Sequence, residues 1–76
     1  MTKEAKEAIK AAIMTAARVV YPEREKAIKS IHFIKEAGRY GLNVSKIVLI
    51  AKEDLQKIDA ILDGLQDSYD AVDEDA

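Results

Sequence analysis

The fold is decided by the stretch from Val44 to Val72, VSKIVLIAKEDLQKIDAILDGLQDSYDAV. Its apolar residues are spaced alternately four and three positions apart without a break, at Val44, Val48, Ala51, Leu55, Ile58, Leu62, Leu65, Tyr69 and Val72. This heptad spacing is typical of a helix that packs one stripe of side chains against another helix. We therefore expect a helix over about residues 44–69, and a dimer or core seam formed by Val44, Val48, Ala51, Leu55, Ile58, Leu62 and Leu65.

Three features of this helix leave alternatives open. Gly64 costs about 1 kcal/mol against alanine in a helix interior and is also a natural stop, so the helix either ends there or continues. The apolar run Ile47–Ala51 fits a short buried strand as well as a helix, although the seam on both sides favours the helix. Acidic residues at a helix C-terminus are unfavourable, so residues 70–76 are expected to form a frayed acidic tail.

Several apolar residues of the same stretch lie outside the seam, namely Ile47, Leu49, Ile50 and Ile61. A helix that is apolar on more than one side is buried on several faces. The first half of this helix is therefore expected to need more than one neighbour.

The residues before Val44 predict two shorter helices. Thr2 is a suitable N-cap, and apolar residues recur on one face over residues 3–20. Tyr21 and Pro22 then break the pattern, because proline disfavours the helical conformation of the preceding residue and suits the first position of a new helix.

A second helix is therefore expected over residues 22–37. Gly38 and Gly41 would end it, and Asn43 would cap the third helix. The predicted fold class is all-α, a single three-helix domain over residues 1–76 with a long third helix.

The length of the third helix predicts a homodimer. At 1.5 Å per residue it would be about 39 Å long, whereas the first two helices would be about 27 Å and 24 Å. Two shorter helices cannot cover its ends and several faces, and a chain of 76 residues without cysteine has no disulfide to support a small core. A symmetric dimer through the third helix is the simplest closure.

The composition argues against catalysis and metal binding. The chain has no cysteine and a single histidine, His32, so a zinc site is not expected. No arrangement of nucleophile, base or phosphate loop is present, so we expect no enzyme activity and no cofactor. No targeting segment and no apolar run of about 20 residues is visible, which predicts a soluble cytoplasmic protein that does not enter the membrane.

The charges are distributed unevenly along the chain. Residues 18–52 hold eight Lys/Arg against three Glu, a charge of +5, and residues 53–76 hold nine acids against one Lys, a charge of −8. Either both are solvated faces or each meets a partner of opposite charge. Candidate residues for nucleic-acid contact are Arg18, Arg39, Asn43, Ser45, Lys46 and Lys52. Candidate residues for an acidic partner surface are Asp59, Asp63, Asp67 and Asp70.

The segment Glu36–Leu55, EAGRYGLNVSKIVLIAKEDL, consists of a helix end at glycine, a short turn and an Asn-Val-Ser-Lys start of an apolar helix. It resembles the helical core of ribbon-helix-helix DNA-binding proteins. The resemblance implies that residues 15–21 form a strand, that Arg18 faces bases, and that residues 43–46 hold a backbone phosphate. A helix-turn-helix protein with residues 43–52 as recognition helix is a further DNA-binding alternative.

These patterns predict a small non-enzymatic regulatory protein that binds a partner protein and is itself a homodimer. The alternative is a dimeric DNA-binding transcriptional regulator that uses the basic middle segment.

Overall fold

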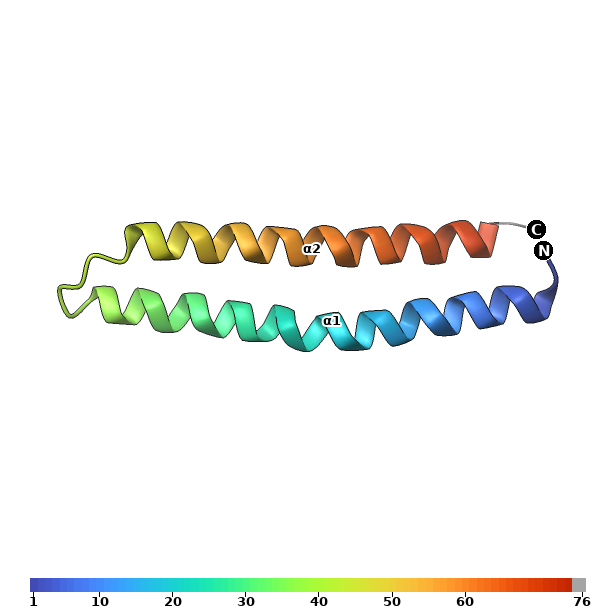
Figure 1. Ribbon diagram of the computed structural model, residues 1–76, viewed down its shortest axis with the longest axis horizontal. Coiled ribbons are helices and arrows are strands. Elements are labelled where there is room, and N and C mark those ends of the chain that lie inside the picture. The colour runs from blue at the N-terminus through green and yellow to red at the C-terminus, as the bar shows by residue number, and fades with distance from the viewer. Residues whose placement is uncertain (75–76) are drawn as a thin grey trace.

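The protein is an antiparallel hairpin of two long helices, seen in a computed structural model that describes residues 1–74 (Figure 1). Helix α1 spans Lys3–Gly38 and helix α2 spans Ser45–Glu74. The molecule measures 59 × 15 × 11 Å, so the two helices form a single layer. The predicted all-α class is confirmed, but the three-helix domain is wrong because the described chain has two helices.

The predicted break at Tyr21 and Pro22 is wrong, because α1 continues through both residues. Pro22 lies on the exposed side of α1. Helix α1 has its own seam of residues that are shielded from solvent, spaced alternately four and three positions apart on both sides of the proline. They are Lys6, Lys10, Ile13, Ala17, Val20, Arg24, Ala27, Ile31, Ile34 and Gly38. Contact with α2 along this whole seam outweighs the roughly 3 kcal/mol that proline costs inside a helix.

The helix ends and the turn follow local rules. Thr2 caps α1 as predicted, since its Oγ1 accepts a hydrogen bond from the Ala5 N–H at 3.1 Å. In the turn, Gly41 has φ +92°, a conformation that glycine adopts without strain. Asn43 Oδ1 accepts hydrogen bonds from the Ser45 hydroxyl at 2.8 Å and, more loosely, from the Ser45 N–H at 3.4 Å. The cap position of α2 is Val44, whose carbonyl accepts a hydrogen bond from the Val48 N–H at 2.9 Å, so the predicted cap at Asn43 is one residue too early.

The seam predicted on residues 44–72 is the surface that α2 packs against α1. All nine of its residues are partly shielded in the hairpin. The helix passes through Gly64 without a stop, and Ile47–Ala51 is helical, so neither the early stop nor the strand occurs. The frayed tail is wrong for residues 70–74, which are helical; residues 75–76 lie outside the described residues.

The overhanging third helix, on which the predicted dimer depends, does not occur. Because α1 is continuous, its 36 residues extend over about 54 Å, and the 30 residues of α2 extend over about 45 Å. Helix α1 is therefore long enough to cover the seam of α2 along its whole length, and α2 has no overhang.

Ionic contacts join the helices along the seam. The Arg24 Nε lies 2.6 Å from Asp59 Oδ1, and Lys10 pairs with Asp73. The Lys10 ammonium also lies over the ring of Tyr69, 5.2 Å from its centroid. These contacts show which residues of α1 and α2 lie at the same level of the rod.

The core of the hairpin is very thin. Among residues 1–74, only Ile31 is a buried hydrophobic residue, at 8% exposure. The accessible surface is 5948 Å², whereas a compact folded chain of 8.4 kDa exposes about 4,600 Å². The single hairpin thus exposes about 1,300 Å² more than a compact chain of its mass.

Candidate interaction surfaces

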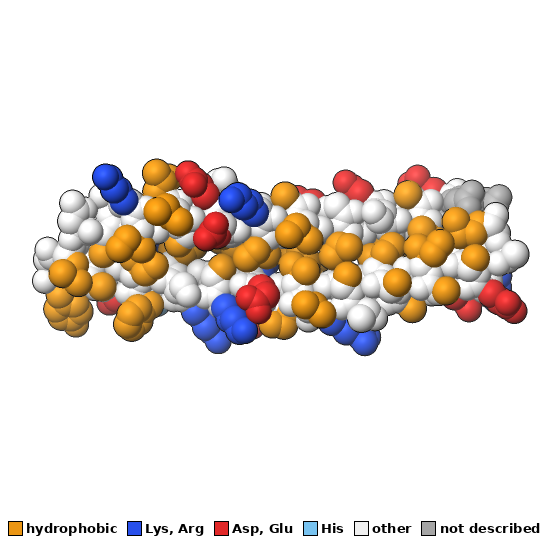
Figure 2. Space-filling view, in the orientation of Figure 1, with side chains coloured by type: hydrophobic (Ala, Val, Ile, Leu, Met, Phe, Trp, Pro, Cys, Tyr) orange, Lys and Arg blue, Asp and Glu red, His pale blue; other side chains and the backbone are white. Residues whose placement is uncertain are grey.

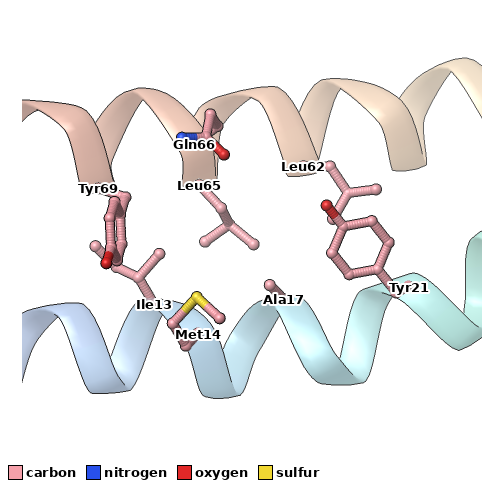
Figure 3. Close-up of a pocket in the computed structure, with 8 residues that line it drawn as sticks. All are labelled: Ile13, Met14, Ala17, Tyr21, Leu62, Leu65, Gln66 and Tyr69. Atoms are coloured by element: carbon pink, nitrogen blue, oxygen red, sulfur yellow. The ribbon is translucent and has the colours of Figure 1, made fainter.

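A groove runs between the helices on one flank of the seam (Figure 3). It has a volume of about 350 Å³. In Figure 3 the rings of Tyr69 and Tyr21 stand at its two ends, and Met14, Ala17 and Leu65 lie between them. The remaining lining residues are Ile13, Leu62 and Gln66.

The groove is lined mainly by apolar side chains. Its polar atoms are the hydroxyls of Tyr21 and Tyr69 and the amide of Gln66, and no carboxylate, imidazole or amine lines it. Its volume is near the lower end of the range for small-molecule sites.

The opposite flank of the seam carries a second apolar surface. On α2 a second series of residues alternates three and four positions apart, at residues 47, 50, 54, 57, 61, 64, 68 and 71. On α1 the corresponding residues are 5, 9, 12, 16, 19, 23, 26, 30 and 33. We call these two series together the outer face. Its exposed large hydrophobic residues are Ile9, Val19, Phe33, Ile47, Ile50 and Ile61.

The outer face and the groove point in opposite directions. Groove residues such as Met14 and Gln66 directly follow a seam residue, whereas Ile47 and Ile61 directly precede one, which places them on the other side of the helix. Helix α2 lies above α1 in both Figure 1 and Figure 3, but α1 runs in opposite directions in the two views. Figure 3 therefore shows the hairpin from behind relative to Figure 1. Figure 2 therefore shows the outer face, with hydrophobic side chains along both helices.

Charged residues interrupt the outer face at one place. They are Glu23 and Lys26 on α1 and Asp54 and Lys57 on α2. Lys26 Nζ lies 3.2 Å from Glu23 Oε1. The alignment of the helices puts all four at nearly the same level, and Figure 2 shows acidic and basic side chains together there. The outer face is thus apolar at both ends and contains both signs of charge between them.

The residues predicted to contact nucleic acid fall in two places. Five of them lie in or near the turn and the first turns of α2, namely Arg39, Asn43, Ser45, Lys46 and Lys52. Arg18 lies 21 positions before Arg39, about 31 Å away along the helix axis. Residues 15–21, which the ribbon-helix-helix resemblance implies as a strand, are helical.

The predicted acidic surface is divided by the fold. Asp59 lies toward the seam and pairs with Arg24. Asp63, Asp67 and Asp70 are exposed on α2 outside the outer face, and the Gln66 amide donates to Asp70 Oδ1 at 3.0 Å. One of the four candidates therefore contributes to the hairpin itself.

The described residues offer neither clustered metal ligands nor a membrane span. Within residues 1–74, no group of three or more His, Asp or Glu is placed to hold a metal ion. Neither described helix combines the length and the hydropathy that a membrane span requires. His32 is exposed on α1.

The groove and the outer face had one detectable signal in the sequence. It was the four-three spacing on both sides of Pro22, which indicates a continuous α1 and hence two flanks shared by two helices.

Comparison of the chain with protein-family models, with curated proteins and with solved structures finds no match. The fold and its surfaces define an antiparallel helical hairpin with apolar flanks.

Proposed function

We propose that the protein works by packing its exposed helix faces against helices of another polypeptide, as a small regulatory protein without catalysis of its own. The observation that supports this is the exposed surface of 5948 Å², about 1,300 Å² above that of a compact chain of the same mass. A standard protein–protein interface buries about 800 Å² on each partner, so the excess is large enough to supply one.

The distribution of exposed apolar residues supports the outer face as the contact surface. Val19 is 67% exposed and Phe33 77% exposed, and both lie on this face of α1. Ile47, Ile50 and Ile61 extend the same face on α2. Clusters of exposed apolar side chains mark interaction sites in soluble proteins, and apolar residues at heptad spacing are the contacts that a helix offers to another helix.

A capture experiment with two matched variants tests the proposal. Ile61 is 52% exposed on the outer face of α2, and Leu49 is 59% exposed on α2 outside that face. A tagged wild-type chain should capture a polypeptide, either another protein or an untagged copy of itself. Ile61→Asp should abolish capture and Leu49→Asp should retain it. Equal capture by all three chains would refute the proposal.

Nuclease treatment in the same experiment tests the DNA-binding alternative. Capture through helix packing should survive digestion of nucleic acid. Capture that is lost on digestion, and that weakens steeply as salt is raised, would instead favour a role in DNA binding for the basic residues near the turn.

A further inference from the structure

We infer that the occupant of the outer face is a second copy of this chain, turned about an axis along the rod. Helix α1 of each copy then packs on α2 of the other, and both turns lie at the same end of a four-helix bundle. The inference rests on the proposed function, because it names the partner of the same surface. It differs from the predicted dimer, which used the seam that α1 now covers.

The dimensions fit a dimer. Two helices, each about 10 Å wide and in contact over about 45 Å, present a face of roughly 900 Å². This matches the approximately 800 Å² per partner of a standard interface and uses most of the approximately 1,300 Å² of excess surface. The same face on both copies gives an isologous, closed contact, which is the commonest form of oligomer.

The apolar residues of the two copies meet in this arrangement. The ion pairs Arg24–Asp59 and Lys10–Asp73 fix which residues lie at the same level, and rotation about the rod axis preserves those levels. Phe33 then lies within one helical turn of Ile47 and Ile50 of the second copy. Val19 lies within one turn of Ile61 and Gly64 of the second copy.

Gly64 gives an independent reason for a close neighbour. A Cβ added to Gly64 would meet nothing within 4 Å in the single hairpin, so the hairpin itself does not require glycine there. Glycine nevertheless costs about 1 kcal/mol in a helix interior. In the bundle, Gly64 faces Val19 and Ala16 of the second copy, where a missing side chain allows the helices to approach.

The charges also complement each other. On the outer face, Lys26 lies at the level of Lys57 of the second copy, but each lysine also has an acid of the other copy within one turn, Asp54 for Lys26 and Glu23 for Lys57. As whole helices, α1 has eight Lys/Arg against five Glu, a charge of +3, and α2 has three Lys against eight acids, a charge of −5. Every adjacent pair of helices in the bundle therefore has opposite charge.

The arrangement with the turns at opposite ends lacks these matches. It packs α1 on α1 and α2 on α2, so helices of like charge become neighbours. With the axis at the middle of the rod, it also brings Val19 within one turn of Glu23 of the second copy and Ile61 within one turn of its Lys57, which places apolar residues near charged ones.

Cysteine cross-linking tests the arrangement, since the chain has no cysteine of its own. Ala12 and Ser68 lie on the outer face at neighbouring levels of different copies. Chains with Ala12→Cys mixed with chains with Ser68→Cys should form a disulfide-linked heterodimer on mild oxidation, because a disulfide needs Cα atoms within about 7 Å. Ala11→Cys mixed with Ser68→Cys is the matched control, since Ala11 lies on the groove flank, and its cross-linked product should be absent.

Sedimentation of the same chains separates the two proposals. The wild type and Leu49→Asp should sediment as dimers, and Ile61→Asp should sediment at half that mass. A helical wild-type monomer at high micromolar concentration, or equal cross-linking of the Ala11→Cys control, would overturn the second copy as occupant. If that monomer still captured another protein, and Ile61→Asp abolished the capture, the proposed function would stand without the dimer. Capture that is insensitive to Ile61→Asp would refute the proposed function itself.

Discussion

Replacing Pro22 by alanine should raise the free energy of unfolding, because α1 is continuous at this position. Proline has no N–H to bond the Arg18 carbonyl and its ring crowds that carbonyl, which together cost about 3 kcal/mol relative to alanine in a helix interior. Pro22 is exposed, so its removal costs little packing. Alanine also gives the unfolded chain more conformational freedom than proline does, which lowers the free energy of unfolding by about 0.4–1 kcal/mol. The expected net gain is about 2 kcal/mol, or about 8–16 °C in melting temperature for a domain of this size.

The assay is denaturant unfolding followed by far-UV circular dichroism at one fixed chain concentration, since self-association makes stability depend on concentration. Lys29→Ala is the matched control, because Lys29 is exposed on the same side of α1 one heptad further on, and its effect should stay within about 0.5 kcal/mol. If the chain instead formed separate helices before and after Pro22, proline would occupy a favourable first position. Unchanged or lower stability of Pro22→Ala would therefore refute a continuous α1.

Three further experiments test the hairpin. Ile31→Ala should lower the free energy of unfolding by about 2–4 kcal/mol, measured in the same assay, because Ile31 is the buried residue of a thin core. Gly41→Ala should lower it by about 1–2 kcal/mol, because φ +92° is strained for an L residue; no loss would mean that the turn has another conformation. Arg24→Ala and Asp59→Ala should be coupled by at most about 1 kcal/mol in a double-mutant cycle, since both side chains are more than a third exposed, and the coupling should weaken in salt.

The heptad spacing predicted α2 well because it depends only on residues within one helix. The same spacing exists on α1, but three of its seam positions are the charged residues Lys6, Lys10 and Arg24, so the series is not a series of apolar residues. Without this seam, the local effect of Pro22 predicts a break in the helix. In the folded chain, contacts with α2 on both sides of the proline outweigh that local preference.

The surfaces were harder to predict because they depend on which helices are neighbours. Ile47, Ile50 and Ile61 did indicate a helix that is apolar on more than one side. That observation could not show that they share a face with Val19 and Phe33, since this requires the pairing of α1 with α2. The role of Asp59 likewise depends on Arg24, which lies 35 positions earlier in the chain.

The hairpin brings the start of α1 and the end of α2 together at one end of the rod (Figure 1), where Lys10 pairs with Asp73. In a bundle with both turns at the other end, the end of one copy lies near the start of the next. A Gly/Ser linker of about six residues spans roughly 13 Å, so it could join two copies head to tail in one polypeptide. Covalent joining would replace a bimolecular equilibrium by a high effective concentration. Tandem duplication of this sequence would thus convert the dimer into a single-chain four-helix protein, whereas turns at opposite ends would require a linker along the 59 Å rod.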